Sequence, residues 1–229
     1  DSKQTYVAGY KTKGFTPMHL SVMDGGLDMV EYIYYMSLNY GGMEVFLADT
    51  TGKVNLLSGS QPQLDGLKLS ENGKKAAYLD TDANTGDTIL VEIELGKEKA
   101  ETVATNVQSF GYIGNTLIYY FDYTEGVGTL GAAGSKTTIA NASGVQFTED
   151  AVYYVADADA ATGNGELRAW DGKTETAIAK DVFAFQYKEN GKLVYIGKYD
   201  VNAGVGDLYY YDGKEARKLD TGITAIFIY

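Results

Sequence analysis

A motif recurs along this chain about every forty residues. Each copy holds a short apolar run, a turn that contains glycine and a second short run, as in "ELRAWDGKTETAIA" (166–179) and "DLYYYDGKEARKL" (207–219). The turn glycines lie 44, 38, 38 and 41 residues apart, and they are Gly52, Gly96, Gly134, Gly172 and Gly213. A period of this length predicts an assembly of similar units, each packed against its neighbours.

A second hairpin pattern precedes each of these motifs. It is a strand-forming run that ends in a turn of Asp, Asn and Gly, for example "AVYYVADADAATGNG" (151–165) and "LVYIGKYDVNAGVG" (193–206). A further strand and turn come before it, such as "FAFQYKENGK" (183–192). Each period therefore predicts four short strands, named a, b, c and d in chain order, which is the content of one β-propeller blade.

The segment "FQYKENGKLVYIGKYDVNAGVGDLYYYDGKEARKLDTG" (185–222) resembles the TolB-type, WD40-like β-propeller repeat. The resemblance covers residues 64–229 and is weaker before Met43. The chain lacks the Ser-Pro pair that commonly opens the a–b turn in that family. The resemblance implies a fold but no single function, because such repeats serve in periplasmic partner-binding proteins, peptidase accessory domains and surface proteins.

We therefore predict an all-β fold, a β-propeller of four-stranded antiparallel blades that forms a single domain over residues 1–229. Five blades are favoured, with the C-terminal run "ITAIFIY" closing the ring as the innermost strand of the first blade. The alternative is six blades or an incomplete ring, with "FTPMHLSVM" (15–23) as the first blade's own strand a. The predicted blades and the closing strand cover residues 18–60, 61–106, 107–143, 144–181, 182–222 and 223–229.

Charge and composition restrict the partners. The formal charge is −12, from 19 basic and 31 acidic residues, so the backbone of a nucleic acid would be repelled. The chain has no cysteine, which excludes disulfides and thiolate chemistry, and no apolar run long enough for direct membrane insertion. The start "DSKQTYVAGYK" has neither an initiator Met nor a signal-peptide core, which indicates a piece of a processed, extracellular or cell-surface anchored precursor.

One acidic turn, "DTDANTGD" (80–87), is a candidate calcium site. Hard cations prefer oxygen ligands at alternate positions, and the candidate ligands are Asp80, Asp82, Asn84 and Asp87. The spacing departs from the EF-hand pattern, since Thr85 takes the place of the turn glycine and Glu92 lies one position beyond the bidentate ligand. The related turn "DADAATGNG" (157–165) has fewer ligands, so turn chemistry without a metal is the favoured interpretation. No other cofactor is predicted.

Two other glycine patterns are interpreted as turns. The "GVG" runs at 126–128 and 204–206 have no helix after them whose N-terminus could hold a phosphate, so we predict turns between strands b and c. The "DGK" run around Gly213 predicts a c–d hairpin turn in which this glycine has a positive φ.

No catalytic residues are predicted. His19 is the only histidine, and no nucleophile can be identified beside it. Some five-bladed propellers are glycosidases with carboxylates around the central channel, and the acids near the start of strand a are Asp65, Asp181 and Asp220. A carbohydrate-active hydrolase that uses channel carboxylates is therefore the alternative function, and a purely structural spacer in a longer surface protein is a third.

The favoured function is a non-catalytic binding module for a protein, peptide or glycan. In a propeller the b–c turns and d–a loops share one face, and the a–b and c–d turns share the other. The first face is predicted to be acidic, with Asp80, Asp82, Asp87, Asp122, Glu125, Asp157, Asp159, Asp200 and Asp207. The second is predicted to be mixed and more basic, with Lys53, Lys74, Lys75, Lys97, Lys136, Lys173, Lys192 and Lys214. The acidic face is the predicted ligand surface.

Overall fold

The computed structural model describes residues 17–22, 32–39, 42–49, 54–56, 63–95, 97 and 100–227. These residues form 18 strands that pair antiparallel and no helix, so the described part also contains no helix that could cross a membrane. The all-β class predicted from the sequence is confirmed. The chain divides into two compact units, Asp1–Thr105 and Asn106–Tyr229.

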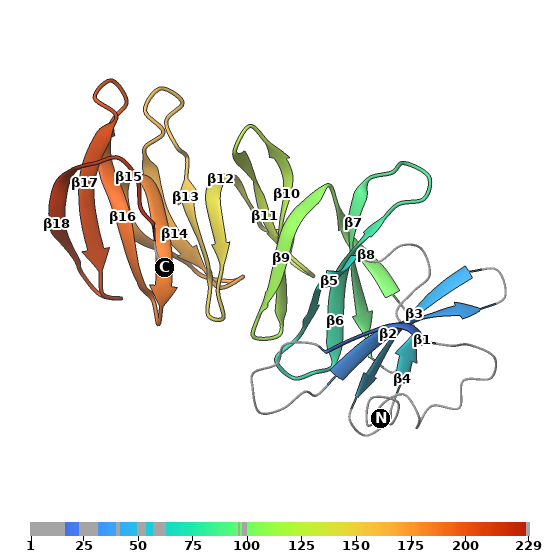
Figure 1. The fold of residues 1–229 in the computed structure, drawn as a ribbon. Coiled ribbons are helices and arrows are strands. Elements are labelled where there is room, and N and C mark those ends of the chain that lie inside the picture. Colours follow the sequence, from blue (N-terminus) through green and yellow to red (C-terminus); the bar gives the residue numbers. More distant parts are fainter. Residues whose placement is uncertain are drawn as a thin grey trace. The chain divides into compact units, whose positions relative to one another are not determined.

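The first unit contains two four-stranded sheets (Figure 1). One sheet follows chain order through β1 (Pro17–Val22), β2 (Tyr32–Asn39), β3 (Gly42–Asp49) and β4 (Val54–Leu56). The other follows chain order through β5 (Gln63–Leu69), β6 (Lys75–Thr81), β7 (Thr88–Glu94) and β8 (Ala100–Thr105). Because β1 already pairs with β2, the run "FTPMHLSVM" supplies the first strand of its own sheet.

Strand β7 shows how the sequence pattern becomes a packed sheet. Successive side chains of a strand point to opposite faces. Ile89, Val91 and Ile93 therefore share one face, where they pack with Tyr78 and other apolar side chains in a single cluster. Glu92 lies on the other face and forms an ion pair of 2.8 Å with a lysine of β6.

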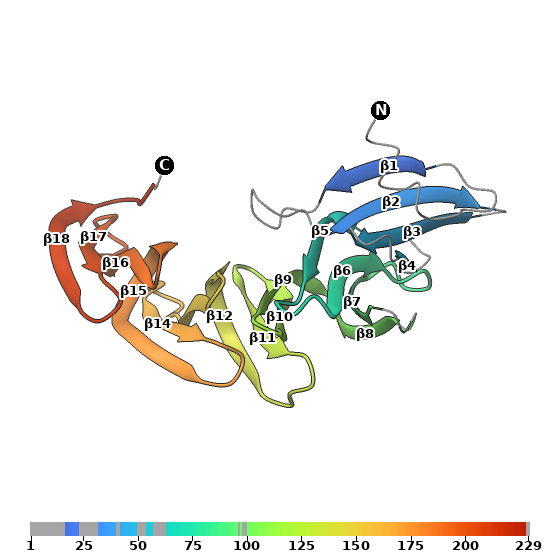
Figure 2. The same ribbon diagram turned by 90° about the horizontal axis from the view of Figure 1, so that it is seen from below.

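The second unit is one antiparallel meander of ten strands, which follow one another in chain order (Figures 1 and 2). The strands are β9 (Val107–Ile113), β10 (Thr116–Thr124), β11 (Val127–Ala132), β12 (Thr138–Phe147), β13 (Val152–Ala156), β14 (Gly165–Trp170), β15 (Glu175–Glu189), β16 (Lys192–Asp200), β17 (Val205–Tyr211) and β18 (Ala216–Ile223).

Two long strands of this unit change partner along their length. The first part of β12 pairs with β11 and its second part with β13, and β15 does the same between β14 and β16. A residue with positive φ marks each change, at Asn141 (55°) and Asp181 (55°). Asn106 (55°) and Gly222 (71°) have the same conformation just before Val107 and Ile223. These four positions are 35, 40 and 41 residues apart, which reproduces the sequence period.

Strand β13 lies in the middle of the core. All five of its residues are buried, and alternate ones enter two different clusters. Tyr154 packs with Trp170 in one cluster, whereas Tyr153 packs with Leu167 and Phe185 in the other. A strand that is covered on both faces reads as a continuous apolar run, which is how "AVYYVA" appears in the sequence. Trp170 is 2% exposed.

Polar side chains tie the successive parts of this unit together. The Gln146 amide of β12 donates to the carbonyl of Phe185, and its oxygen accepts from the amide of Tyr187, both at 3.0 Å. Beyond β18, residues 224–227 are not in a strand, and 228–229 lie outside the described residues. The closing strand 223–229 and the ring closure therefore stay predictions.

Candidate functional site

The turns of the second unit lie at two ends of its strands (Figure 1). We call the end with the β10–β11, β13–β14 and β16–β17 turns the acidic end, and the end with the β11–β12, β14–β15 and β17–β18 turns the opposite end. The acidic residues predicted for one face lie at or beside the acidic end, and in this unit they are Asp122, Glu125, Asp157, Asp159, Asp200 and Asp207. The opposite end is mixed, with Lys136, Lys173 and Lys214 beside Asp171, Asp212 and Glu215.

The longer acidic turns are held by their own aspartates. Oδ1 of Asp159 accepts hydrogen bonds from the amides of Ala161 (3.0 Å) and Thr162 (2.9 Å). Oδ1 of Asp200 does the same in the next such turn, at 2.9 and 3.2 Å. The bonds to Asp159 favour its charged carboxylate, and the backbone bond from Thr162 is the largest cause of its lowered pKa. The turns therefore present their negative charges on a fixed backbone.

Paired asparagines and aspartates hold the strand ends beneath these turns. The Asn106 amide donates to Oδ1 of Asp122 (3.2 Å), and Asn141 donates to Asp157 in the same way (3.3 Å). All four residues have positive φ, which Asn and Asp tolerate better than most residues. Neither asparagine was predicted from the sequence. Each asparagine lies 16 residues before its partner aspartate, and this repeated spacing could have identified both pairs in the sequence.

The second glycine of each "GVG" run is required by close approach of the backbone. A Cβ on Gly206 would lie 2.5 Å from Ile196 Cγ2 and 2.9 Å from the carbonyl oxygen of Gly197. The same holds at the start of β11 and β14. A Cβ on Gly128 would lie 2.7 Å from Tyr120 Cε2, and a Cβ on Gly165 would lie 2.4 Å from the carbonyl oxygen of Ala156. The runs lie in the β10–β11 and β16–β17 turns and at the strands that follow, as predicted.

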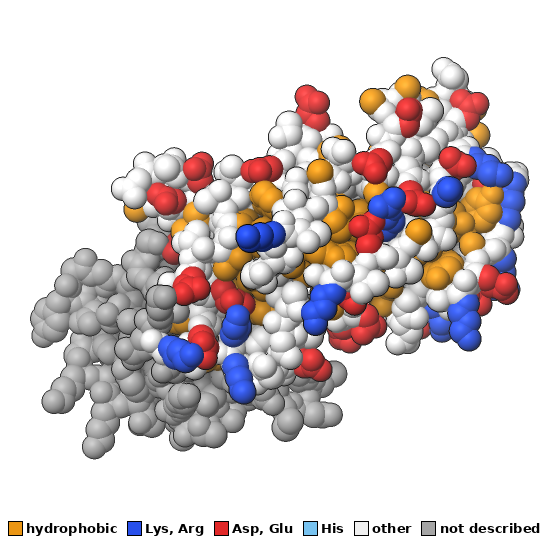
Figure 3. Space-filling model, turned by 180° about the vertical axis from the view of Figure 1, so that it is seen from behind, with side chains coloured by type: hydrophobic (Ala, Val, Ile, Leu, Met, Phe, Trp, Pro, Cys, Tyr) orange, Lys and Arg blue, Asp and Glu red, His pale blue; other side chains and the backbone are white. Residues whose placement is uncertain are grey.

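Aromatic and apolar side chains are exposed among the carboxylates at the acidic end (Figure 3). Phe183 stacks on Tyr199 with ring centroids 3.8 Å apart and planes 8° apart, and a Cβ on Gly163 would lie 3.0 Å from Cε2 of the Phe183 ring. Tyr123 is 49% exposed and Val201 is 52% exposed. Exposed apolar side chains therefore lie beside carboxylates at this end.

Asn164 fixes the β13–β14 turn to β16, a strand of the next repeat. Its amide donates to the carbonyl of Tyr199 (2.9 Å), and its oxygen accepts from the Tyr199 amide (3.2 Å). Because Tyr199 carries Phe183 on its ring, this pair of hydrogen bonds also positions the exposed aromatic stack. Sequence reasoning did not find Asn164, since nothing in the local pattern names its partner 35 residues away.

The candidate calcium ligands lie in the β6–β7 turn of the first unit and at the strand ends beside it. Asp80 is 2% exposed on β6, and its Oδ1 accepts from the amide of Thr81 at 2.7 Å. Oδ1 of Asp82 accepts from the amides of Asn84 (2.8 Å) and Thr85 (3.1 Å), as Asp159 does in its turn. The described residues contain no group of three or more His, Cys, Asp or Glu side chains arranged to hold a metal. Calcium binding here stays a prediction.

The three acids considered for catalysis lie on β5, β15 and β18. Asp181 and Asp220 belong to the second unit, where β16 and β17 separate their strands. Three strand spacings amount to about 14 Å, whereas a glycosidase pair needs about 5–9.5 Å. These two carboxylates therefore do not form such a pair with each other. His19 lies in β1, and Asp65 lies in the first unit.

The opposite end repeats the aspartate turn in a shorter form. Oδ1 of Asp212 accepts from the amides of Lys214 and Glu215, both at 2.9 Å. Gly213 between them has a φ of 99°, which confirms the positive φ predicted from "DGK". In the equivalent turn Gly172 has a φ of 92°, and a pocket opens beside it.

No protein-family model and no curated protein matches the chain. Solved structures match in fold. An acylaminoacyl peptidase in complex with a chloromethyl ketone is 12% identical over 95% of this chain and 40% of its own, with a TM-score of 0.50. The β-propeller domain of the Trilobed protease from Pyrococcus furiosus is 13% identical over 90% and 72%, with a TM-score of 0.49. TolB from Acinetobacter baumannii is 13% identical over 84% and 53%, with a TM-score of 0.42.

The chain spans less than half of the peptidase and about half of TolB. At these identities the likeness shows the fold alone. The fold is β-propeller-like, as the sequence resemblance implied.

Proposed function

We propose that this chain, with its β-propeller-like fold, is a non-catalytic binding module whose acidic end receives a lysine- or arginine-rich segment of a partner protein. The observation that carries the proposal is the presence of exposed apolar side chains among carboxylates that form no ion pair with another described residue. Among the described residues, no ion pair involves Asp122, Glu125, Asp157, Asp159 or Asp200.

A cationic segment fits both parts of this surface. The ammonium or guanidinium groups would meet the carboxylates, and the aliphatic stems of the same side chains would cover Tyr123, Phe183 and Val201. A cation can also lie over the face of an exposed tyrosine ring. A net charge of −12 steers a cationic partner toward the protein and repels an anionic one.

We further propose that the strands make five four-stranded blades. In this arrangement β12 and β15 each supply strand d of one blade and strand a of the next. The positive φ residues Asn141 and Asp181 are the points where the chain passes from blade to blade. The two four-stranded sheets of the first unit would be the remaining blades. A crystal structure of the full chain would test the number, and a sixth blade would contradict it.

The binding proposal is tested with a labelled ten-residue peptide that contains five lysines and two leucines. The variant Glu125→Gln/Asp159→Asn/Asp200→Asn removes three charges at the acidic end. Asparagine keeps an Oδ1 that accepts the turn amides, so the turns should remain folded. We expect about tenfold weaker binding by fluorescence anisotropy, since an exposed charge pair contributes about 0.2–1 kcal/mol.

The matched control is Glu149→Gln/Asp171→Asn/Asp212→Asn, which makes the same charge change at the opposite end, where Glu149 lies in the β12–β13 turn. Its affinity should stay near that of the unmodified protein, and a peptide with glutamates in place of the lysines should not bind. If both triple variants lose the same affinity for the lysine peptide, the peptide recognises only the net charge of the protein, and the proposal is overturned. Failure of the lysine peptide to bind at low salt would overturn it as well.

A further inference from the structure

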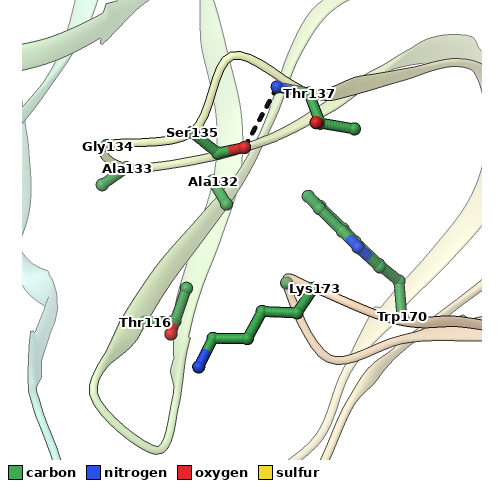
Figure 4. Close-up of a pocket in the computed structure, with 9 residues that line it drawn as sticks. Thr116, Ala132, Ala133, Gly134, Ser135, Thr137, Trp170 and Lys173 are labelled. Carbon is green, nitrogen blue, oxygen red and sulfur yellow. Dashed lines mark hydrogen bonds between the residues drawn. The ribbon is translucent and has the colours of Figure 1, made fainter.

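A pocket of about 350 Å³ opens at the opposite end of the second unit, away from the proposed peptide surface (Figure 4). Thr116 of β10 lies on one side, and Ser135 and Thr137 come from the β11–β12 turn. Trp170 and Lys173 come from the end of β14 and the turn that follows it. The pocket thus joins two neighbouring repeats within one unit.

Glycine makes this arrangement possible. A Cβ on Gly172 would lie 2.9 Å from Thr116 Cγ2 and 3.2 Å from Ile118 Cδ1, so the β14–β15 turn packs directly on β10. The same turn holds Trp170 and Lys173 on either side of Gly172. Figure 4 shows the Lys173 side chain extending toward Thr116, with the Trp170 indole at another wall.

The polar groups of the pocket are hydrogen-bond donors or hydroxyls. Lys173 supplies an ammonium group that forms no ion pair with another described residue. The indole N–H of Trp170, a residue 2% exposed, has no acceptor among the described residues. Oγ of Ser135 accepts from the amide of Thr137 at 3.0 Å, which leaves the Ser135 hydroxyl hydrogen free to donate.

The described residues that line the pocket include no carboxylate, although the chain has 31 acidic residues. The nearest acid in sequence, Asp171, uses Oδ1 to accept the amides of Lys173 (2.8 Å) and Thr174 (2.6 Å). A concave site with one cation, three hydroxyls and an indole, but no carboxylate, is complementary to a negative ligand that carries hydroxyls.

We infer that this pocket binds a small hydroxylated organic anion of the sugar-acid class. Its carboxylate pairs with the Lys173 ammonium group, and its hydroxyls bond to Thr116, Ser135 and Thr137. The Trp170 indole closes one wall and can donate its N–H. The volume is at the lower end of the range of about 300–1,000 Å³ for small-molecule sites, which suits one sugar ring.

Trp170 is the only tryptophan in the chain, so its fluorescence reports on this pocket. We expect titration with glucuronate to change the emission saturably in the unmodified protein. Lys173→Gln should weaken binding at least about tenfold, the scale of one lost hydrogen bond to a charged group. Lys214→Gln is the matched control, because Lys214 has the same place in the next aspartate turn and does not line the pocket.

Each of the other outcomes would overturn the inference. A titration without saturable change shows that the pocket does not bind this class of ligand. Equal binding of glucose shows that the charge is not recognised, and equal binding of inorganic phosphate shows that the hydroxyls are not. An equal loss in Lys173→Gln and Lys214→Gln excludes a local role for Lys173. Because the acidic end takes no part, these results are independent of the peptide experiment.

Discussion

The two ends of the second unit share one local device and differ as surfaces. At each end an aspartate, such as Asp159 or Asp171, accepts hydrogen bonds from two backbone amides of its own turn. The acidic turns then expose carboxylates and apolar side chains, whereas two of the opposite turns, β14–β15 and β17–β18, place a lysine directly after glycine. The turn chemistry stabilises the fold at both ends. We propose that the other exposed side chains of these turns determine what each end binds.

The largest effect is expected where the acidic end brings backbone close to backbone. A Cβ at Gly165 would lie 2.4 Å from the carbonyl oxygen of Ala156, so Gly165→Ala should lower the free energy of unfolding by about 3 kcal/mol. Gly134→Ala at the opposite end is the control. A Cβ there would meet nothing within 4 Å beyond its chain neighbours, so the alanine would be strained only by the positive φ of this position. Urea denaturation of both variants checks this, and equal losses would contradict the close approach.

A smaller difference is expected within the opposite end. Gly172 and Gly213 have nearly the same φ, 92° and 99°, but only Gly172 packs on a neighbouring strand. Gly172→Ala should cost about 2 kcal/mol and Gly213→Ala about 1 kcal/mol, since only the first adds a steric clash to backbone strain. If thermal unfolding ranks the two variants the other way, the packing of the β14–β15 turn on Thr116 is wrong.

The aromatic stack at the acidic end is expected to stabilise the fold moderately. Phe183→Ala removes the contact with Tyr199 and should cost about 1–1.5 kcal/mol, the scale of an aromatic pair together with partial burial. Val201→Ala should cost less than about 0.5 kcal/mol, because that side chain is half exposed and belongs to no aromatic pair. Denaturation midpoints of the two variants would show whether the stack is a structural element or only an exposed patch.

The smallest expected effect is on the pH dependence of the free energy of unfolding, and it should be the same at both ends. Backbone hydrogen bonds lower the pKa of Asp159 and Asp212 below the usual 3.8. A lowered folded-state pKa stabilises the fold above pH 3.8, and this contribution is lost as the pH falls through the folded-state value. Asp159→Asn and Asp212→Asn should each flatten the acid limb of a stability profile, because the variant already lacks at pH 7 the small contribution that the unmodified protein loses in acid. A steeper acid limb in either variant would contradict the hydrogen-bonded turns.

Local patterns in the sequence were sufficient for the turns and strands. The positive φ of Gly213 follows from a short motif whose chemistry is nearly self-contained. Asn164 could not be identified, because its partner backbone is 35 residues away and is brought near only by packing. The pocket beside Lys173 depends likewise on a turn that reaches Thr116 of another repeat. The sequence therefore does not predict residues whose contacts lie in another repeat.

The most direct test of the acidic end as the binding surface is a map of amide chemical shifts while the lysine peptide is added. The amides of Ala161, Thr162 and Ala203 lie in the acidic turns, and those of Thr174 and Glu215 lie in the opposite ones. We expect saturable shifts at the first three and almost none at the other two. Shifts confined to Thr174 and Glu215, or spread evenly over both ends, would contradict the assignment of the acidic end as the binding surface.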